Sequence, residues 1–99
     1  MFYKARNYDV ANRTKKASDL YKEVIENYPN SYWTKEAKFH LGVLNYKHMD
    51  LNSAEALLND LYYDTFPRVD VVGYYLGLIS KKNNNYKEAF NYFSLSNHY

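Results

Sequence analysis

Apolar residues recur every three or four positions along most of this chain, with polar residues between them. Between residues 14 and 28 the apolar positions follow the i, i+3, i+4, i+7 spacing of a half-buried helix. They are Ala17, Leu20, Tyr21, Val24, Ile25 and Tyr28. No useful length alternates with a period of two, so strands are not expected. The pattern predicts six helices, over about 2–12, 14–28, 32–48, 51–64, 68–82 and 85–97.

Helix-ending and helix-starting residues separate these segments. Pro29 ends the second helix, because the residue before a proline is pushed out of the helical region. Ser31 then offers an N-cap to the third helix. Asn85 and Glu88 form an Asn-x-x-Glu variant of the capping box and start the sixth helix. The loops are short, so consecutive helices are expected to lie antiparallel.

The chain also repeats itself. Leu41–Gly42 recurs 35 residues later as Leu76–Gly77. A sustained period of this size indicates a stacked-repeat architecture. Each predicted hairpin has two small residues 12 positions apart, where a larger side chain would hold the helix axes too far from each other. These pairs are Ala5 with Ala17, Gly42 with Ala54, and Gly77 with Ala89.

Together with the closing residues Pro29 and Pro67, this pattern resembles the tetratricopeptide repeat (TPR), whose period is about 34 residues. The resemblance spans essentially the whole chain. It implies an all-α fold, a right-handed TPR-like α-solenoid of three helix-turn-helix hairpins with six helices. We interpret residues 1–99 as a single TPR-like domain, with repeats at about 1–29, 30–66 and 67–99, and as a fragment of a longer chain.

The stretch from Ala17 to Gly42, through Tyr28-Pro29-Asn30-Ser31-Tyr32-Trp33, is more specific. It resembles the TPR subgroup of bacterial cell-envelope proteins. That subgroup includes the lipoprotein of the outer-membrane β-barrel assembly machinery and periplasmic coordinators of envelope constriction. The resemblance implies an adaptor in the bacterial cell envelope or periplasm, although residues 1–99 contain no signal peptide.

In stacked hairpins the first helix of each pair lines the concave side. Periodicity predicts eight partner-binding positions on that side. They are Phe2 and Arg6, then Phe39, Val43 and Tyr46, then Tyr74, Leu78 and Lys81. An apolar, aromatic surface with a basic rim suits a partner helix or an extended peptide segment of another protein. The alternative is that these residues pack on a neighbouring helix of a larger TPR scaffold with no autonomous ligand.

Charge and composition narrow the function further. The net charge is only +2 with both signs interspersed, unlike the basic stripe of a nucleic-acid binder. RNA binding through Lys81, Lys82 and Lys87 is the weaker alternative. There is no apolar run of 18 residues, so no direct membrane insertion is expected. The sequence leaves the oligomeric state open.

No catalytic constellation stands out. The chain has no cysteine, and His40, His48 and His98 lie scattered without an H-E-x-x-H pattern. We therefore expect no enzyme activity, no catalytic residues, no metal site and no cofactor. The function that the sequence favours is a protein–protein interaction module or adaptor that binds a partner segment in its concave groove.

Overall fold

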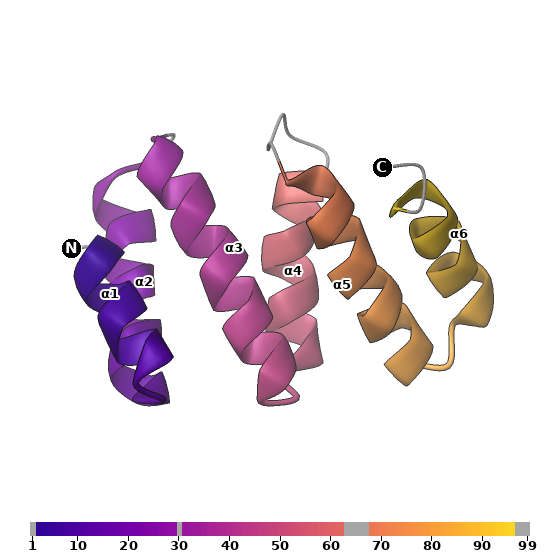
Figure 1. The fold of residues 1–99 in the computed structure, drawn as a ribbon. Coiled ribbons are helices and arrows are strands. Elements are labelled where there is room, and N and C mark those ends of the chain that lie inside the picture. Colours follow the sequence, from indigo (N-terminus) through magenta and orange to yellow (C-terminus); the bar gives the residue numbers. More distant parts are fainter. Residues whose placement is uncertain (1, 30, 63–67, 97–99) are drawn as a thin grey trace.

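The computed structural model describes residues 2–29, 31–62 and 68–96, and the side chains as far as Phe93. These residues form six α-helices and no strand (Figure 1), which confirms the all-α, TPR-like hairpin fold. Each bound lies within two residues of its prediction, although the predicted ends of the fourth and sixth helices fall outside the described residues. The helices are α1 (Phe2–Val10), α2 (Thr14–Asn27), α3 (Tyr32–Lys47), α4 (Leu51–Tyr62), α5 (Val69–Lys82) and α6 (Tyr86–Ser96).

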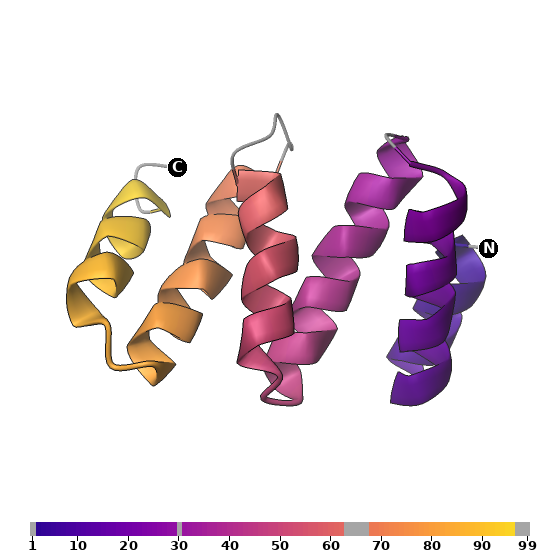
Figure 2. The ribbon, with the colours of Figure 1, turned by 180° about the vertical axis from the view of Figure 1, so that it is seen from behind.

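Consecutive helices pair as three hairpins, α1–α2, α3–α4 and α5–α6, which stand in a row. Helices α1, α3 and α5 lie towards the viewer in Figure 1, and α2 and α4 do so from behind in Figure 2. The row measures 38 × 26 × 19 Å. This arrangement places the first helices of all three hairpins side by side on one face.

Two hydrophobic cores fill the row, and α3 belongs to both. Ala37, Leu41 and Leu44 on α3 pack with the first hairpin, around the fully buried Tyr21. Phe39 on another side of α3 packs with α4, α5 and α6. A helix with two apolar faces is what an inner position in a stack requires.

The three hairpins turn in the same way. Asn12, Met49 and Asn84 each adopt a positive φ, between 61° and 64°. In each turn the next residue donates its N–H to the carbonyl five positions back, as in a Schellman motif. The bonds are Arg13 to Tyr8 (2.8 Å), Asp50 to Asn45 (2.9 Å) and Asn85 to Ser80 (2.8 Å). The sequence repeat is therefore also a repeat of backbone geometry.

Side chains cap the helices where the sequence predicts it. The Ser31 hydroxyl accepts from the Thr34 N–H at 3.1 Å. The Asn85 side-chain oxygen accepts from the Glu88 N–H at 3.4 Å. Glu88 in turn accepts from the Asn85 side-chain amide at 2.6 Å. Pro67, which is expected to close the second repeat, lies outside the described residues.

The small residues do bring the helices of each hairpin close, but the tightest contact is not with the paired alanine. A Cβ on Gly42 would stand 2.9 Å from the side chain of Leu58. A Cβ on Gly77 would stand 2.6 Å from the ring of Phe93. Each glycine therefore leaves room for a large side chain one turn beyond the alanine.

Candidate functional site

A groove runs across the face formed by α1, α3 and α5, with a cavity volume of about 420 Å³. All three hairpins contribute to it through their first helices. Its lining residues are Arg6, Asp9, Val10 and Asn12, then Phe39, His40, Val43, Leu44 and Lys47, then Val71 and Tyr75. The volume lies within the usual range of pockets that bind ligands.

The floor of the groove is apolar. Phe39 is 8% exposed, and Val43 and Val71 are half-buried against the same core. Tyr75 lies beside them and meets Tyr46 edge to face, with ring centroids 5.6 Å apart. These side chains from α3 and α5 form a continuous apolar surface between the second and third hairpins.

A hydrogen-bonded cluster stands at the α1 side of the groove. The Tyr21 hydroxyl donates to Asp9 at 2.8 Å, and Arg6 donates to the same carboxylate oxygen at 3.1 Å. Burial raises the pKa of Tyr21, so its hydroxyl stays protonated and keeps donating. The hydrogen bond to Tyr21 raises the pKa of Arg6. The cluster therefore holds the Arg6–Asp9 ion pair at the α1 side of the groove.

A second cluster surrounds His40. Burial, and then the positive charges of Arg6 and Arg68, lower the pKa of His40 to about 4. Its ring stacks on Tyr21, with centroids 6.0 Å apart. The buried Glu36 lies 3.8 Å from His40 and forms an ion pair with Arg68. His40 therefore faces the groove as a neutral imidazole at neutral pH, which can both donate and accept a hydrogen bond.

The structure brings some of the predicted binding residues together. Arg6, Phe39 and Val43 all line the groove. Tyr46 does not line it but contacts the lining residue Tyr75, and Lys82 Nζ stands 5.7 Å from the centre of the Tyr46 ring. The sequence reasoning missed Asp9, His40, Lys47, Val71 and Tyr75. Each lies three or four residues, about one helical turn, from a predicted position on its own helix, and this spacing is the signal that could have found it.

Tyr74, Leu78 and Lys81 do not line the groove. Tyr74 is 49% exposed and its ring contacts Tyr75 and Phe93. Leu78 is half-buried and Lys81 is exposed. The three recur every three or four residues and so share one side of α5, which adjoins the side of Val71 and Tyr75 that lines the groove. Their proposed part in partner binding stays a prediction.

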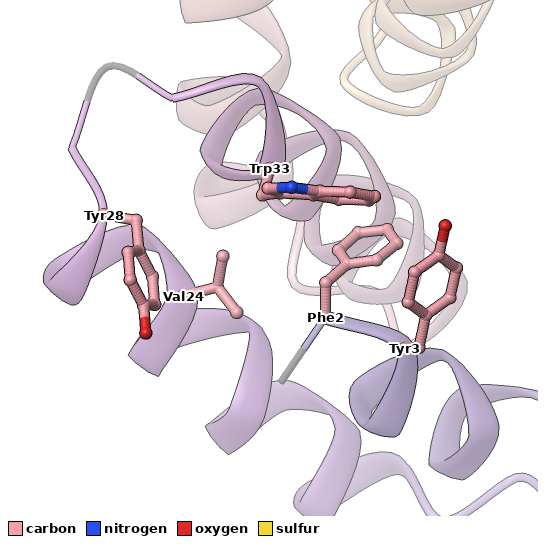
Figure 3. A pocket seen from close by; sticks show the side chains of 5 residues that line it. All are labelled: Phe2, Tyr3, Val24, Tyr28 and Trp33. Atoms are coloured by element: carbon pink, nitrogen blue, oxygen red, sulfur yellow. The ribbon is translucent and has the colours of Figure 1, made fainter.

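Phe2 lies in a separate pocket of about 180 Å³, between the start of α1, the end of α2 and the start of α3. Figure 3 shows the rings of Phe2 and Trp33 on one side of Val24 and Tyr28 on the other. The Phe2 and Trp33 centroids are 5.2 Å apart. Phe2 thus joins the first hairpin to the second and does not reach the groove.

The described residues hold no group of three or more histidine, cysteine or acidic side chains that could bind a metal ion. Within the same residues no helix has the length and hydrophobicity needed to cross a bilayer.

Residues 1–31 match the family described as tetratricopeptide repeat. This match covers the first hairpin and the connection to the second. Comparison with curated proteins and with solved structures gave no match. Tetratricopeptide repeats generally mediate protein–protein interaction.

Proposed function

We propose that this chain is a non-enzymatic interaction module that binds a segment of a partner protein in the groove across α1, α3 and α5. The observation that carries the proposal is the continuity of the groove. Three successive hairpins each contribute side chains to one concave surface. Such a surface can hold a segment along several turns of helix or several extended residues.

The lining suggests the character of that segment. The apolar floor at Val43, Val71 and Tyr75 suits aliphatic or aromatic anchors. The neutral imidazole of His40 and the Arg6–Asp9 pair offer hydrogen bonds beside the floor. Because Arg6 and Asp9 already neutralise each other, a partner segment does not need a high net charge. The lining thus favours an amphipathic helix or an extended segment with spaced apolar residues.

A site in the bacterial cell envelope or periplasm is part of the same proposal. Its support is the stretch from Ala17 to Gly42, which resembles the envelope TPR subgroup. There the module would act as an adaptor between envelope proteins. Fractionation of the native cells, with an antibody against this chain, tests the location directly. Recovery in the cytoplasmic fraction alone would contradict it.

The groove can be tested by photo-crosslinking. Benzoylphenylalanine replaces Tyr75, inside the groove, or Glu23, on the exposed side of α2, in the native cells. We expect a heterologous crosslinked protein from position 75 and none from position 23. Adding Val71→Glu, which puts a charge on the groove floor, should remove the crosslink. Equal crosslinking from both positions, or insensitivity to Val71→Glu, would refute groove binding.

A further inference from the structure

The outer side of the third hairpin carries an ordered stripe of side chains. Asp70, Tyr74, Leu78 and Lys81 recur at intervals of four, four and three residues along α5, and therefore lie on one side of it. The stripe begins with an acid in the first turn of α5 and ends with a base in the last turn. Between the two charges lie an aromatic and an aliphatic side chain.

This stripe faces away from the rest of the row. Val72, Leu76 and Ile79, on the opposite side of α5, are buried in the core shared with the second hairpin. Helix α6 extends the outer side with Tyr86 and Phe90, one turn apart and 62% and 70% exposed. We call the six residues Asp70, Tyr74, Leu78, Lys81, Tyr86 and Phe90 the end face.

The end face continues an interface that exists inside the molecule. One repeat earlier, 35 residues back, Tyr74, Leu78 and Tyr86 correspond to Phe39, Val43 and Leu51. Those three pack into the core against the third hairpin. The end face thus keeps the apolar character of a stacking surface, without a helix of the described residues packed on it.

The opposite end of the row has no such character. On α1, Lys4 and Asn7 occupy the positions that Leu41 and Leu44 occupy on α3, and both are exposed. The side chains that pack one hairpin onto the previous one are therefore replaced by polar ones. Head-to-tail stacking of two copies would set the aromatic end face against these exposed polar side chains.

We propose that the end face binds the end face of a second copy of this chain, with the two α5 helices antiparallel about a two-fold axis. Antiparallel pairing sets Asp70 of each copy near Lys81 of the other, and the apolar Tyr74 and Leu78 meet their counterparts between these charges. The acid–apolar–base order is complementary to its own reverse, as an isologous interface requires. The dipoles of two antiparallel helices also attract each other.

The oligomeric state of the 99-residue chain tests this dimer. Analytical ultracentrifugation over a concentration series should show a mass rising from 11.8 kDa towards twice that value. Phe90→Glu should weaken dimerisation at least about tenfold, since a charge enters the apolar interface. Tyr3→Glu is the matched control, because Tyr3 is also aromatic and is 68% exposed on the first hairpin, outside the groove. A monomer up to millimolar concentration, or equal weakening by both variants, overturns the proposal.

A charge exchange tests the antiparallel arrangement. Asp70→Lys alone and Lys81→Glu alone each place like charges opposite each other at both ends of the interface, so each should dimerise several-fold more weakly than the wild type. Mixing the two variants restores opposite charges at both ends. Native mass spectrometry should then show the heterodimer in excess over either homodimer. A statistical mixture would refute the antiparallel pairing, and circular dichroism of each variant confirms that it is folded.

Discussion

The first hairpin and the second close by different chemistry. In the first, the fully buried Tyr21 of α2 reaches back to Asp9 of α1 with its hydroxyl, and alanine at position 5 is tolerated. In the second, Leu58 of α4 packs directly on the backbone of Gly42. The same helix pairing is thus reached once with a buried hydrogen bond and once with hydrocarbon alone. Repeats can therefore share the same hairpin geometry while different interactions hold the two helices together.

The difference extends to the joints between hairpins. The first hairpin meets the second through aromatic rings and the half-buried His40. The second meets the third through a core that is mainly aliphatic, with the Tyr46–Tyr75 ring contact beside it and the Glu36–Arg68 ion pair at one edge. We therefore expect the first half of the row to respond to pH and to the loss of single polar groups. The second half should respond chiefly to changes of volume.

The largest effect is expected from Leu58→Ala in the second hairpin. Leu58 is fully buried, and its removal leaves a cavity against Gly42. Such a truncation costs about 3 kcal/mol of unfolding free energy. Urea denaturation followed by circular dichroism measures the loss. A loss below about 1 kcal/mol would show that the hairpin does not depend on hydrocarbon packing.

The next largest effect is a pH dependence in the first half of the row. The pKa of His40 is about 4 in the folded chain, against an ordinary value of 6.5. Above pH 6.5 the ring is neutral in both states and causes no loss of stability. As the pH falls from 6.5 towards 4, the unfolded chain takes up the proton first, and unfolding becomes easier. At pH 5 the loss is about 2 kcal/mol.

Comparing the wild type with His40→Gln isolates this contribution, because glutamine does not titrate. Urea midpoints are measured for both proteins at pH 7.5 and pH 5. The wild type should lose about 2 kcal/mol more than the variant between the two pH values. Parallel losses in the two proteins would mean that His40 does not carry the pH dependence.

A smaller effect is expected from Tyr21→Phe, which keeps the ring and removes the hydroxyl. Asp9 then loses a 2.8 Å hydrogen bond and retains Arg6. Hydrogen bonds to charged groups contribute about 1.5 kcal/mol. The variant should melt at a lower temperature without a change in its helical spectrum. If Tyr21→Phe is as stable as the wild type, ring packing alone closes the first hairpin and the contrast with the second disappears.

The smallest effect is expected from Gly42→Ala. The new methyl would lie 2.9 Å from the fully buried Leu58 side chain, which disfavours it by about 2 kcal/mol. Alanine also gains about 1 kcal/mol of helix propensity, so the net loss is about 1 kcal/mol. Combining Gly42→Ala with Leu58→Val should then be less destabilising than the sum of the two changes. Strict additivity, measured by a double-mutant cycle, would contradict the direct contact.

The sequence predicts the helices and hairpins well, because apolar spacing and capping residues act within one or two turns. It also predicts Arg6, Phe39 and Val43 on the groove. The positions on α5 came from adding 35 residues to those on α3. That step assumes that each first helix has the same neighbours. Phe39 and Val43 lie beside a following hairpin, whereas Tyr74 and Leu78 have none among the described residues. On α5 the groove is therefore lined by Val71 and Tyr75 and not by Tyr74 and Leu78. The His40 cluster also escaped prediction, since it joins side chains from three helices.

The double role of α3 has a mechanical consequence. Both cores close on this helix, while α1–α2 and α5–α6 each hold to only one of them. A chain pulled from its two ends would therefore lose its outer hairpins first and release α3 last. A module built in this way can yield under tension at one end while the central helix α3 stays packed.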